Sequence, residues 1–128
     1  MIENKVTDPQ RTRALSHFEL CRVVEYLHAN LKGDLSLGVI ANMMCISTTY
    51  FACLFKRTTG QPLHQYVLQL RVAKAKALLL QSDISIAQIS LLVGFHDSSH
   101  LIRHFKRLLG TPPAFFRKNH KNVQHSPQ

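Results

Sequence analysis

Apolar residues recur every three or four positions along most of the chain, the spacing of one face of an α-helix. The first stretch ends near Gly33 and has apolar side chains at Leu20, Val23, Val24, Leu27 and Leu31. A longer stretch opens at Pro62 and continues to about Gln81 without an internal Gly or Pro. Each stretch predicts a helix, and the second is long enough to be one continuous rod.

One sequence unit occurs twice in the chain. Leu35-Ser36-Leu37 recurs as Ile84-Ser85-Ile86 after 49 residues, and Phe55-Lys56-Arg57 recurs as Phe105-Lys106-Arg107 after 50 residues. The slip of one residue falls between Ile46 and Ser47, where a turn accommodates an insertion most easily. An internal repeat of this kind predicts two copies of one supersecondary unit.

Each copy predicts two short helices joined by a tight turn. In the first copy, Ser36 and Ser47 are suitable N-caps, the turn lies at Cys45-Ile46, and Gly60 ends the second helix. In the second copy the corresponding features are the caps Ser85 and Asp97, the turn Gly94-Phe95 and the stop Gly110. Two short helices joined in this way form a helix-turn-helix, whose second helix enters the DNA major groove.

These elements predict an all-α fold of about seven helices, with two helix-turn-helix subdomains joined by a long central helix. The expected segments are a tail over 1–17, a first subdomain over 18–61, a linker helix over 62–82, a second subdomain over 83–119 and a tail over 120–128. A 20-residue helix spans about 30 Å, and neighbouring major grooves on one side of B-DNA are about 34 Å apart. A monomer is therefore expected to place two recognition helices one DNA turn apart.

The charge of the chain points to a polyanion as its partner. The sequence has 16 Lys and Arg against 7 Asp and Glu, a net charge of +9, and a pI of about 10.0. The basic excess is spread over several helical segments, which disfavours a membrane-surface helix. No apolar run is long enough to span a membrane and no signal peptide opens the chain, so we expect a cytoplasmic, nucleoid-associated protein without a membrane partner.

The sequence indicates no metal site, cofactor or enzyme activity. The cysteines Cys21, Cys45 and Cys53 lack a CxxC spacing. His96, His100 and His104 recur every four residues, but no carboxylate or thiol is placed to complete a metal shell around them. Paired carboxylates, a Gly-rich phosphate loop and a nucleophile constellation are all missing, so an enzyme is not expected.

The second predicted recognition helix, 98–109, carries the polar groups best suited to reading bases. Ser99, His100 and Arg103 fall within one sector near its N-terminal half, whereas Leu101 and Phe105 point to the core. The planar guanidinium of Arg103 can bond guanine O6 and N7 together. The alternative for Arg103 is a phosphate contact or a solvated surface arginine.

Other polar residues are predicted to contact the DNA backbone. Lys56 and Lys106 are equivalent in the two repeats, as are Arg57 and Arg107, and basic side chains on both sides of a groove typically contact phosphates. A solvated basic face is the competing interpretation for each. Arg71 on the predicted linker helix is expected either to be solvated or to be a structural residue that ties the two lobes together. The full set of predicted backbone contacts is Ser47, Lys56, Arg57, Ser98, His104, Lys106 and Arg107.

The run from Gly94 through His96, Asp97 and Ser98 to Arg107, followed by Gly110, Pro113 and Arg117, resembles the second-unit signature of the AraC/XylS transcription regulators. The first unit is similar at Ser47, Tyr50-Phe51, Leu54 to Lys56 and Gly60. The resemblance covers roughly residues 18 to 118. It implies two helix-turn-helix units joined by a long helix, in agreement with the pattern above.

The resemblance also indicates where the two units differ. It maps the base-facing positions of the first recognition helix, 47–59, to Thr49, Ala52 and Cys53, which offer little hydrogen-bonding reach. The family usually has Gly where this chain has Cys45, so the first turn is expected to be strained if its φ is positive, by about 1 kcal/mol or more. Sequence specificity is therefore expected in the half-site contacted by Arg103.

The function predicted from the sequence is sequence-specific binding of double-stranded promoter or operator DNA by a transcription regulator. The resemblance implies activation more often than repression, with RNA polymerase as a further partner, and dimerisation only through an additional domain. The alternative is a nonspecific architectural DNA-binding protein, because the first recognition helix is poor in base-reading groups.

Overall fold

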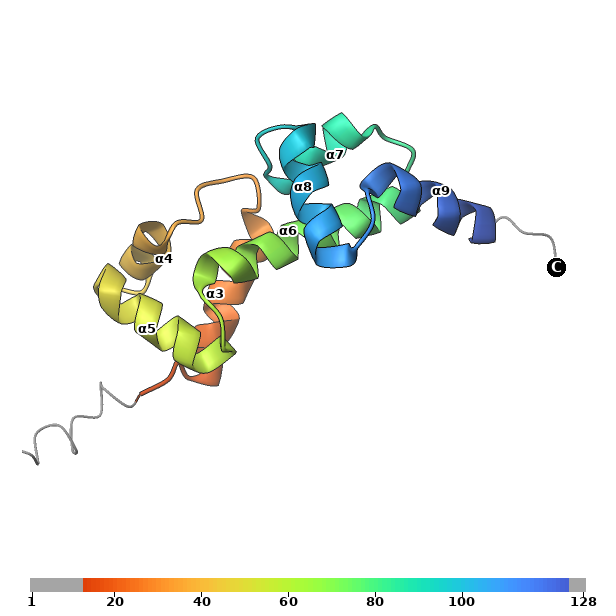
Figure 1. Ribbon diagram of the computed structural model, residues 1–128. Coiled ribbons are helices and arrows are strands. Elements are labelled where there is room, and N and C mark those ends of the chain that lie inside the picture. Colours follow the sequence, from red (N-terminus) through yellow and green to blue (C-terminus); the bar gives the residue numbers. More distant parts are fainter. Residues whose placement is uncertain (1–12, 125–128) are drawn as a thin grey trace, which may run out of the picture.

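The computed structural model describes residues 13–124, which form seven α-helices and no strand, confirming the predicted all-α class (Figure 1). The helices are α3 (His17–Ala29), α4 (Leu37–Met43), α5 (Thr48–Thr59), α6 (Leu63–Gln81), α7 (Ile86–Val93), α8 (Ser98–Leu109) and α9 (Pro113–Gln124). Figure 1 shows α6 crossing the middle of the molecule, with α3 to α5 around one end and α7 to α9 around the other.

Two separate hydrophobic cores share the central helix. The first lobe, α3 to α5 with the start of α6, has a core that includes Val23, Leu27 and Phe51. The second lobe, α7 to α9 with the rest of α6, has a core that includes Ile89 and Phe105. Successive turns of α6 serve one core and then the other: Leu63 and Val67 belong to the first, and Val72, Ala75 and Leu79 to the second.

The predicted caps fix where the short helices begin. The side chains of Ser36, Ser47 and Ser85 accept from the backbone N–H three residues on, at distances of 3.4, 3.1 and 3.0 Å. Asp97 Oδ1 accepts from the His100 N–H at 2.9 Å. Each bond satisfies one of the donors that the first turn of a helix leaves unpaired, so the sequence positions of the caps were predicted correctly.

Both ends of the folded part extend further than the segments predicted from the sequence. Leu15 lies in the first core, and Arg13 forms an ion pair of 2.7 Å with Glu19, so 13–17 is not part of a tail. The expected start at about residue 18 was wrong because a single apolar residue in a polar stretch has no periodicity to reveal it. Helix α9 continues to Gln124, beyond the predicted limit at 119; residues 1–12 and 125–128 of the predicted tails lie outside the described residues.

A junction between the lobes forms where α6 passes the loop after α3 and the turn after α7. Arg71 on α6 donates from Nε to the carbonyl oxygen of Leu31 at 3.1 Å and from its terminal nitrogen to that of Gly33 at 3.3 Å. Gly94 packs so closely here that a Cβ would lie 1.9 Å from the Leu31 oxygen and 2.7 Å from Arg71 Nε. Burial lowers the pKa of the Arg71 guanidinium.

The two tight turns, equivalent in the repeat, use different residues. Cys45 ends the first with a φ of 62°, the only positive φ of a non-glycine residue within 13–124, and its side chain is exposed. Gly94 ends the second with a φ of 101°. A side chain fits at the first turn because it points to solvent, and it does not fit at the second because the Leu31 carbonyl occupies that space.

Among the described residues, no single helix is long and apolar enough to cross a membrane, although the bent pair α4 and α5 meets the length and composition criteria when taken together.

Replacing Gly94 by Ala should destabilise the fold by about 3 kcal/mol or more, since it adds steric overlap with Leu31 to the strain of a left-handed backbone. The matched control is Gly110→Ala, where φ is 81° and nothing lies within 4 Å of the added Cβ, so only about 1–2 kcal/mol is expected. Urea unfolding followed by circular dichroism measures both. Equal losses would show that the Leu31 contact is unimportant.

Replacing Cys45 by Gly should stabilise the domain by about 0.5–1 kcal/mol, because the relief of left-handed strain exceeds the entropy that Gly adds to the unfolded chain. Cys45→Ala is the control: it removes the thiol but keeps the Cβ, and the free energy of unfolding should change by less than about 0.5 kcal/mol. A gain as large for Ala as for Gly would place the strain elsewhere.

Candidate DNA interface

The outward face of α8 is polar and basic. Leu101 and Phe105 are fully buried in the second core, and the opposite side of the helix carries exposed Ser99, Arg103 and Lys106. The side chain of Arg103 makes no hydrogen bond or ion pair within the described part of the chain, so the five N–H donors of its guanidinium are available to a ligand. The structure therefore turns Ser99 and Arg103 outward together, as their spacing of four residues predicts.

The outward face of α5 holds the equivalent positions with smaller groups. Thr49, Cys53 and Lys56 are exposed and correspond in the repeat to Ser99, Arg103 and Lys106. Ala52 is half-buried at the flank of the helix, where it lines a groove with Lys56 and His64. A thiol therefore occupies the position at which α8 has a guanidinium.

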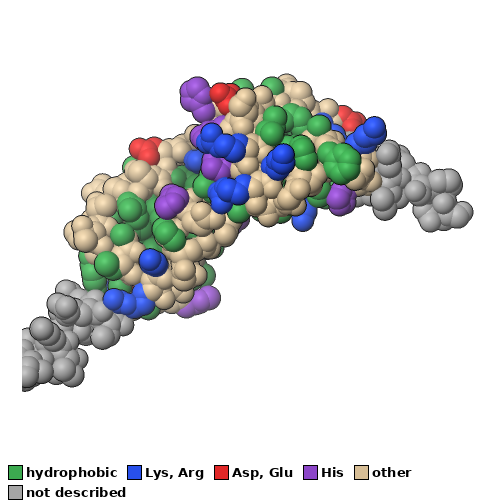
Figure 2. Space-filling view, in the orientation of Figure 1, with side chains coloured by type: hydrophobic (Ala, Val, Ile, Leu, Met, Phe, Trp, Pro, Cys, Tyr) green, Lys and Arg blue, Asp and Glu red, His purple; other side chains and the backbone are tan. Residues whose placement is uncertain are grey.

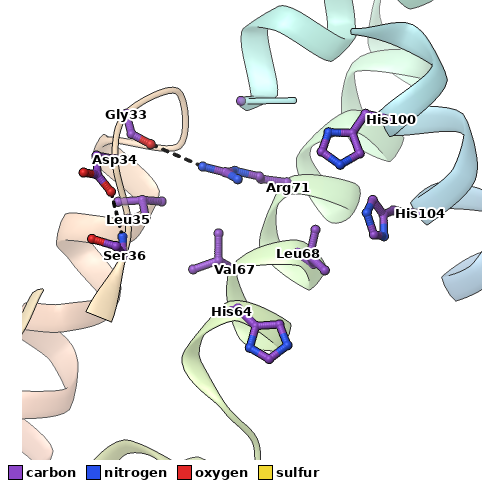
Figure 3. A pocket seen from close by; sticks show the side chains of 11 residues that line it. Gly33, Asp34, Leu35, Ser36, His64, Val67, Leu68, Arg71, His100 and His104 are labelled. Carbon is purple, nitrogen blue, oxygen red and sulfur yellow. Dashed lines mark hydrogen bonds between the residues drawn. The ribbon is translucent and has the colours of Figure 1, made fainter. Parts of the chain in front are cut away.

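His100 and His104 lie on the flank of α8, not on its outward face. The His104 ring stacks on Phe95 at 5.8 Å and an interplanar angle of 15°, and the His100 ring meets Phe95 edge-on at 5.6 Å. Figure 3 shows both imidazoles turned into a space between the lobes. The predicted grouping of His100 with Ser99 and Arg103 is thus only partial, because one residue along a helix turns the side chain by about 100°.

The space between the lobes is an open cavity of about 540 Å³, here called the inter-lobe pocket. The polar residues that line it are Asp34 and Ser36 from the loop after α3, His64 and Arg71 from α6, and His100 and His104 from α8 (Figure 3). It adjoins the groove beside α5 through His64, which lines both. The pocket therefore lies between the two recognition helices.

The electrostatic surroundings hold His104 in its neutral form. Desolvation by the neighbouring side chains lowers the pKa of His104, and the nearby His100, Arg103 and Arg107 lower it further. At the start of α8, the hydrogen bond from the His100 N–H lowers the pKa of Asp97. A lowered pKa favours the charged form of a carboxylate, whereas it favours the neutral form of an imidazole. His96 lies in the turn before α8, apart from the other two histidines. Its side chain is exposed, with Nδ1 at 3.6 Å from Asp97 Oδ2.

Some predicted backbone-contact residues already have partners within the fold. Arg57 donates to the carbonyl oxygen of Arg13 and Ser47 accepts as the cap of α5. Ser98 is half-buried at the first turn of α8. Lys56, Lys106 and Arg107 are exposed, and Figure 2 shows Lys, Arg and His side chains gathered on one face over α8 and the middle of the molecule.

Sequence reasoning did not single out His64, and it left Arg71 undecided between a solvated and a structural role. Both lie on one stripe of α6 with Leu68, at spacings of four and three residues, and all three line the inter-lobe pocket. That stripe is visible in the sequence, but its partners come from the loop after α3 and from α8. The structure resolves the question for Arg71 in favour of the structural role.

Comparison with known proteins agrees with this geometry. Residues 40–119 match a family model described as a helix-turn-helix domain. The Msm operon regulatory protein of Streptococcus mutans is 33% identical over 101 residues, which are 79% of this chain and 36% of that protein. The chain spans about a third of the length of the first curated relatives it matches.

Two solved structures are similar over nearly their whole length. The DNA-binding domain of AdpA, in complex with a target DNA, matches with a TM-score of 0.77 and 28% identity, covering 84% of this chain and 96% of that one. An AraC-type transcriptional regulator from Chromobacterium violaceum matches with a TM-score of 0.73 and 31% identity, covering 78% and 89%. The chain therefore belongs to the family of AraC-type helix-turn-helix DNA-binding domains of transcription regulators.

Proposed function

We propose that this domain reads a specific sequence of double-stranded DNA by inserting α5 and α8 into adjacent major grooves, and that α8 supplies most of the specificity. The observation that carries the proposal is the exposed, unpartnered Arg103, flanked by Ser99 and Lys106 on the outward face of α8. A guanidinium in this position can pair with both acceptors of a guanine, and a neighbouring lysine can contact phosphate.

The proposed base contacts are Ser99 and Arg103 on α8, with Thr49, Cys53 and the half-buried Ala52 on α5. His100, predicted as a base contact, lies at the flank of α8 in the inter-lobe pocket, and we propose that it contacts the DNA backbone instead. The proposed backbone contacts are Ser47, Lys56, Arg57, Ser98, His104, Lys106 and Arg107. Because both recognition helices belong to one chain and α6 links them, the domain would bind as a monomer. The protein would act at promoter DNA in the nucleoid, as an activator that positions RNA polymerase.

The alternative is a sequence-independent architectural binder, and the outward face of α5 is the observation in its favour. Thr49 and Cys53 have little reach for base edges, so this half of the interface depends on backbone contacts. The α8 face favours specific binding instead. Selection of bound duplexes from a random DNA pool, followed by sequencing, separates the two functions: a specific reader enriches a motif, and an architectural binder enriches none.

Arg103→Ala should abolish the preference at one base pair of the selected motif and weaken binding to that motif roughly 5- to 150-fold, corresponding to the loss of a bidentate base contact. Lys106→Ala is the matched control, since it removes a charge from the same face. It should weaken binding to all duplexes alike and reduce the slope of log K against log salt by about 1. Uniform weakening by Arg103→Ala would contradict the base-reading role.

The double change Thr49→Ala and Cys53→Ala should leave the selected motif unchanged and lower affinity less than about 5-fold, since neither side chain reaches far toward the bases. Repeating the selection with this variant measures the motif, and fluorescence anisotropy with a labelled duplex measures the affinity. If base pairs one helical turn away from those that depend on Arg103 disappeared from the motif selected with this variant, α5 would also read bases. That result would contradict the proposed asymmetry between the two recognition helices.

A further inference from the structure

We propose that the inter-lobe pocket is a third DNA-contacting site, in which His100 and His104 bind the sugar-phosphate backbone between the two major grooves in their protonated form. This inference rests on the proposed function. It adds a proton-dependent contact that neither recognition helix provides through its outward face.

The position of the pocket is the first reason. His64 lines both this pocket and the groove that Ala52 and Lys56 of α5 line, while His100 and His104 belong to α8. A duplex whose adjacent major grooves receive α5 and α8 would therefore pass over the pocket. The part of B-DNA between two successive major grooves on one side is a minor groove with its bordering phosphates, so the chemical class presented there is phosphate.

The charge around the pocket is the second reason. Taken together, the basic groups around the two imidazoles outnumber the acidic ones by five to two. These groups are His64 and Arg71 from α6, Arg103 and Arg107 from α8, His96 and Asp97 from the turn before α8, and Asp34 from the loop after α3. Asp97 Oδ1 accepts from the His100 N–H, and Asp34 Oδ1 accepts from the Ser36 N–H at 3.0 Å. Both carboxylates keep their negative charge, so the basic groups favour an anion here only through their excess in number.

The hydrogen bonds define the protonation state of the free protein. The terminal nitrogen of Arg107 lies 3.3 Å from His104 Nδ1. A guanidinium only donates, so Nδ1 must accept and His104 is neutral, with its proton on Nε2. His100 Nδ1 is buried without a hydrogen-bond partner among the described residues, and the two rings lie 5.1 Å apart, so charging both without an anion would be unfavourable.

A phosphate in the pocket reverses this balance. An anion near the imidazoles favours their charged form and raises their pKa in the complex above that in the free protein. Binding then takes up protons, so affinity increases as pH falls from the pKa of the complex toward that of the free protein, and levels off below it. Each proton taken up contributes at most a tenfold change in affinity per pH unit. Phosphate also competes for Arg107, which would release His104 Nδ1 for protonation.

The test uses an unselected 30-base-pair duplex of mixed sequence, because backbone contacts do not depend on sequence. At constant ionic strength, the affinity of the unaltered protein should rise roughly 10-fold between pH 8 and pH 6, measured by fluorescence anisotropy. The double variant His100→Gln and His104→Gln should change less than about 2-fold over the same range. His28→Gln, at an exposed position near the end of α3 outside this pocket, is the matched control and should keep the full response.

A second measurement does not depend on the variants folding. Imidazole ring signals followed by NMR should give a higher pKa for His104 in the duplex complex than in the free protein, where desolvation lowers it. Inorganic phosphate alone should not reproduce the increase, since the site is proposed to need the duplex held by both recognition helices.

Three results would overturn the proposal: pH-independent affinity of the unaltered protein, a full response retained in the double Gln variant, or an equal increase in pKa with inorganic phosphate. Loss of the proposed sequence specificity is distinguishable from all three, because the duplex used here is unselected. Circular dichroism at each pH confirms that the domain is folded, which matters because the lowered pKa of His104 makes the free fold less stable as pH falls below the ordinary value.

Discussion

The backbone carbonyl of Leu31 is the point on which the arrangement of the two lobes depends. It accepts from Nε of Arg71 at 3.1 Å, and Gly94 of the second lobe packs directly against it. A loop of the first lobe, the central helix and a turn of the second lobe therefore meet at one oxygen atom. Rotation of either lobe about α6 would break a half-buried guanidinium contact, and buried polar groups without partners are costly. The spacing between α5 and α8 follows from this junction and from an α6 without internal Gly or Pro.

The repeat explains why the lobes look alike, and the junction explains why they differ. Both units have side-chain caps at the starts of their short helices and left-handed glycines, Gly60 and Gly110, after their recognition helices. The tight turn of the first unit faces solvent and carries Cys45, whereas that of the second abuts the first lobe and carries Gly94. Equivalent positions in a repeat thus experience different constraints once the copies pack together, because only one of them is enclosed by its neighbour.

A single helix, α8, combines three roles that its angular positions separate. Leu101 and Phe105 face the core, His100 and His104 rest on Phe95 at the flank, and Ser99 and Arg103 face outward. Because the inner face of α8 packs in the core, the direction of its outer face is set. Ser99 and Arg103 are therefore held outward by the helix itself. The flanking histidines are different, since the pocket that they line is also built from α6 and from the loop after α3.

The sequence by itself determined the all-α class, the repeated helix-turn-helix unit, the caps and the outward direction of Ser99 and Arg103. The helices, the caps and the direction of these side chains depend on residues within about four positions of one another, where helical geometry and backbone hydrogen bonding decide the outcome. The repeat is visible because the same residue pattern recurs 49 or 50 positions later. Only the tertiary structure decided that Leu15 belongs to the core, that Arg71 joins the lobes, and that His64, His100 and His104 line one pocket. Those relations join residues about 40 positions apart in the chain. Packing between helices decides how close such residues lie in space, and this packing produces no periodic pattern in the sequence.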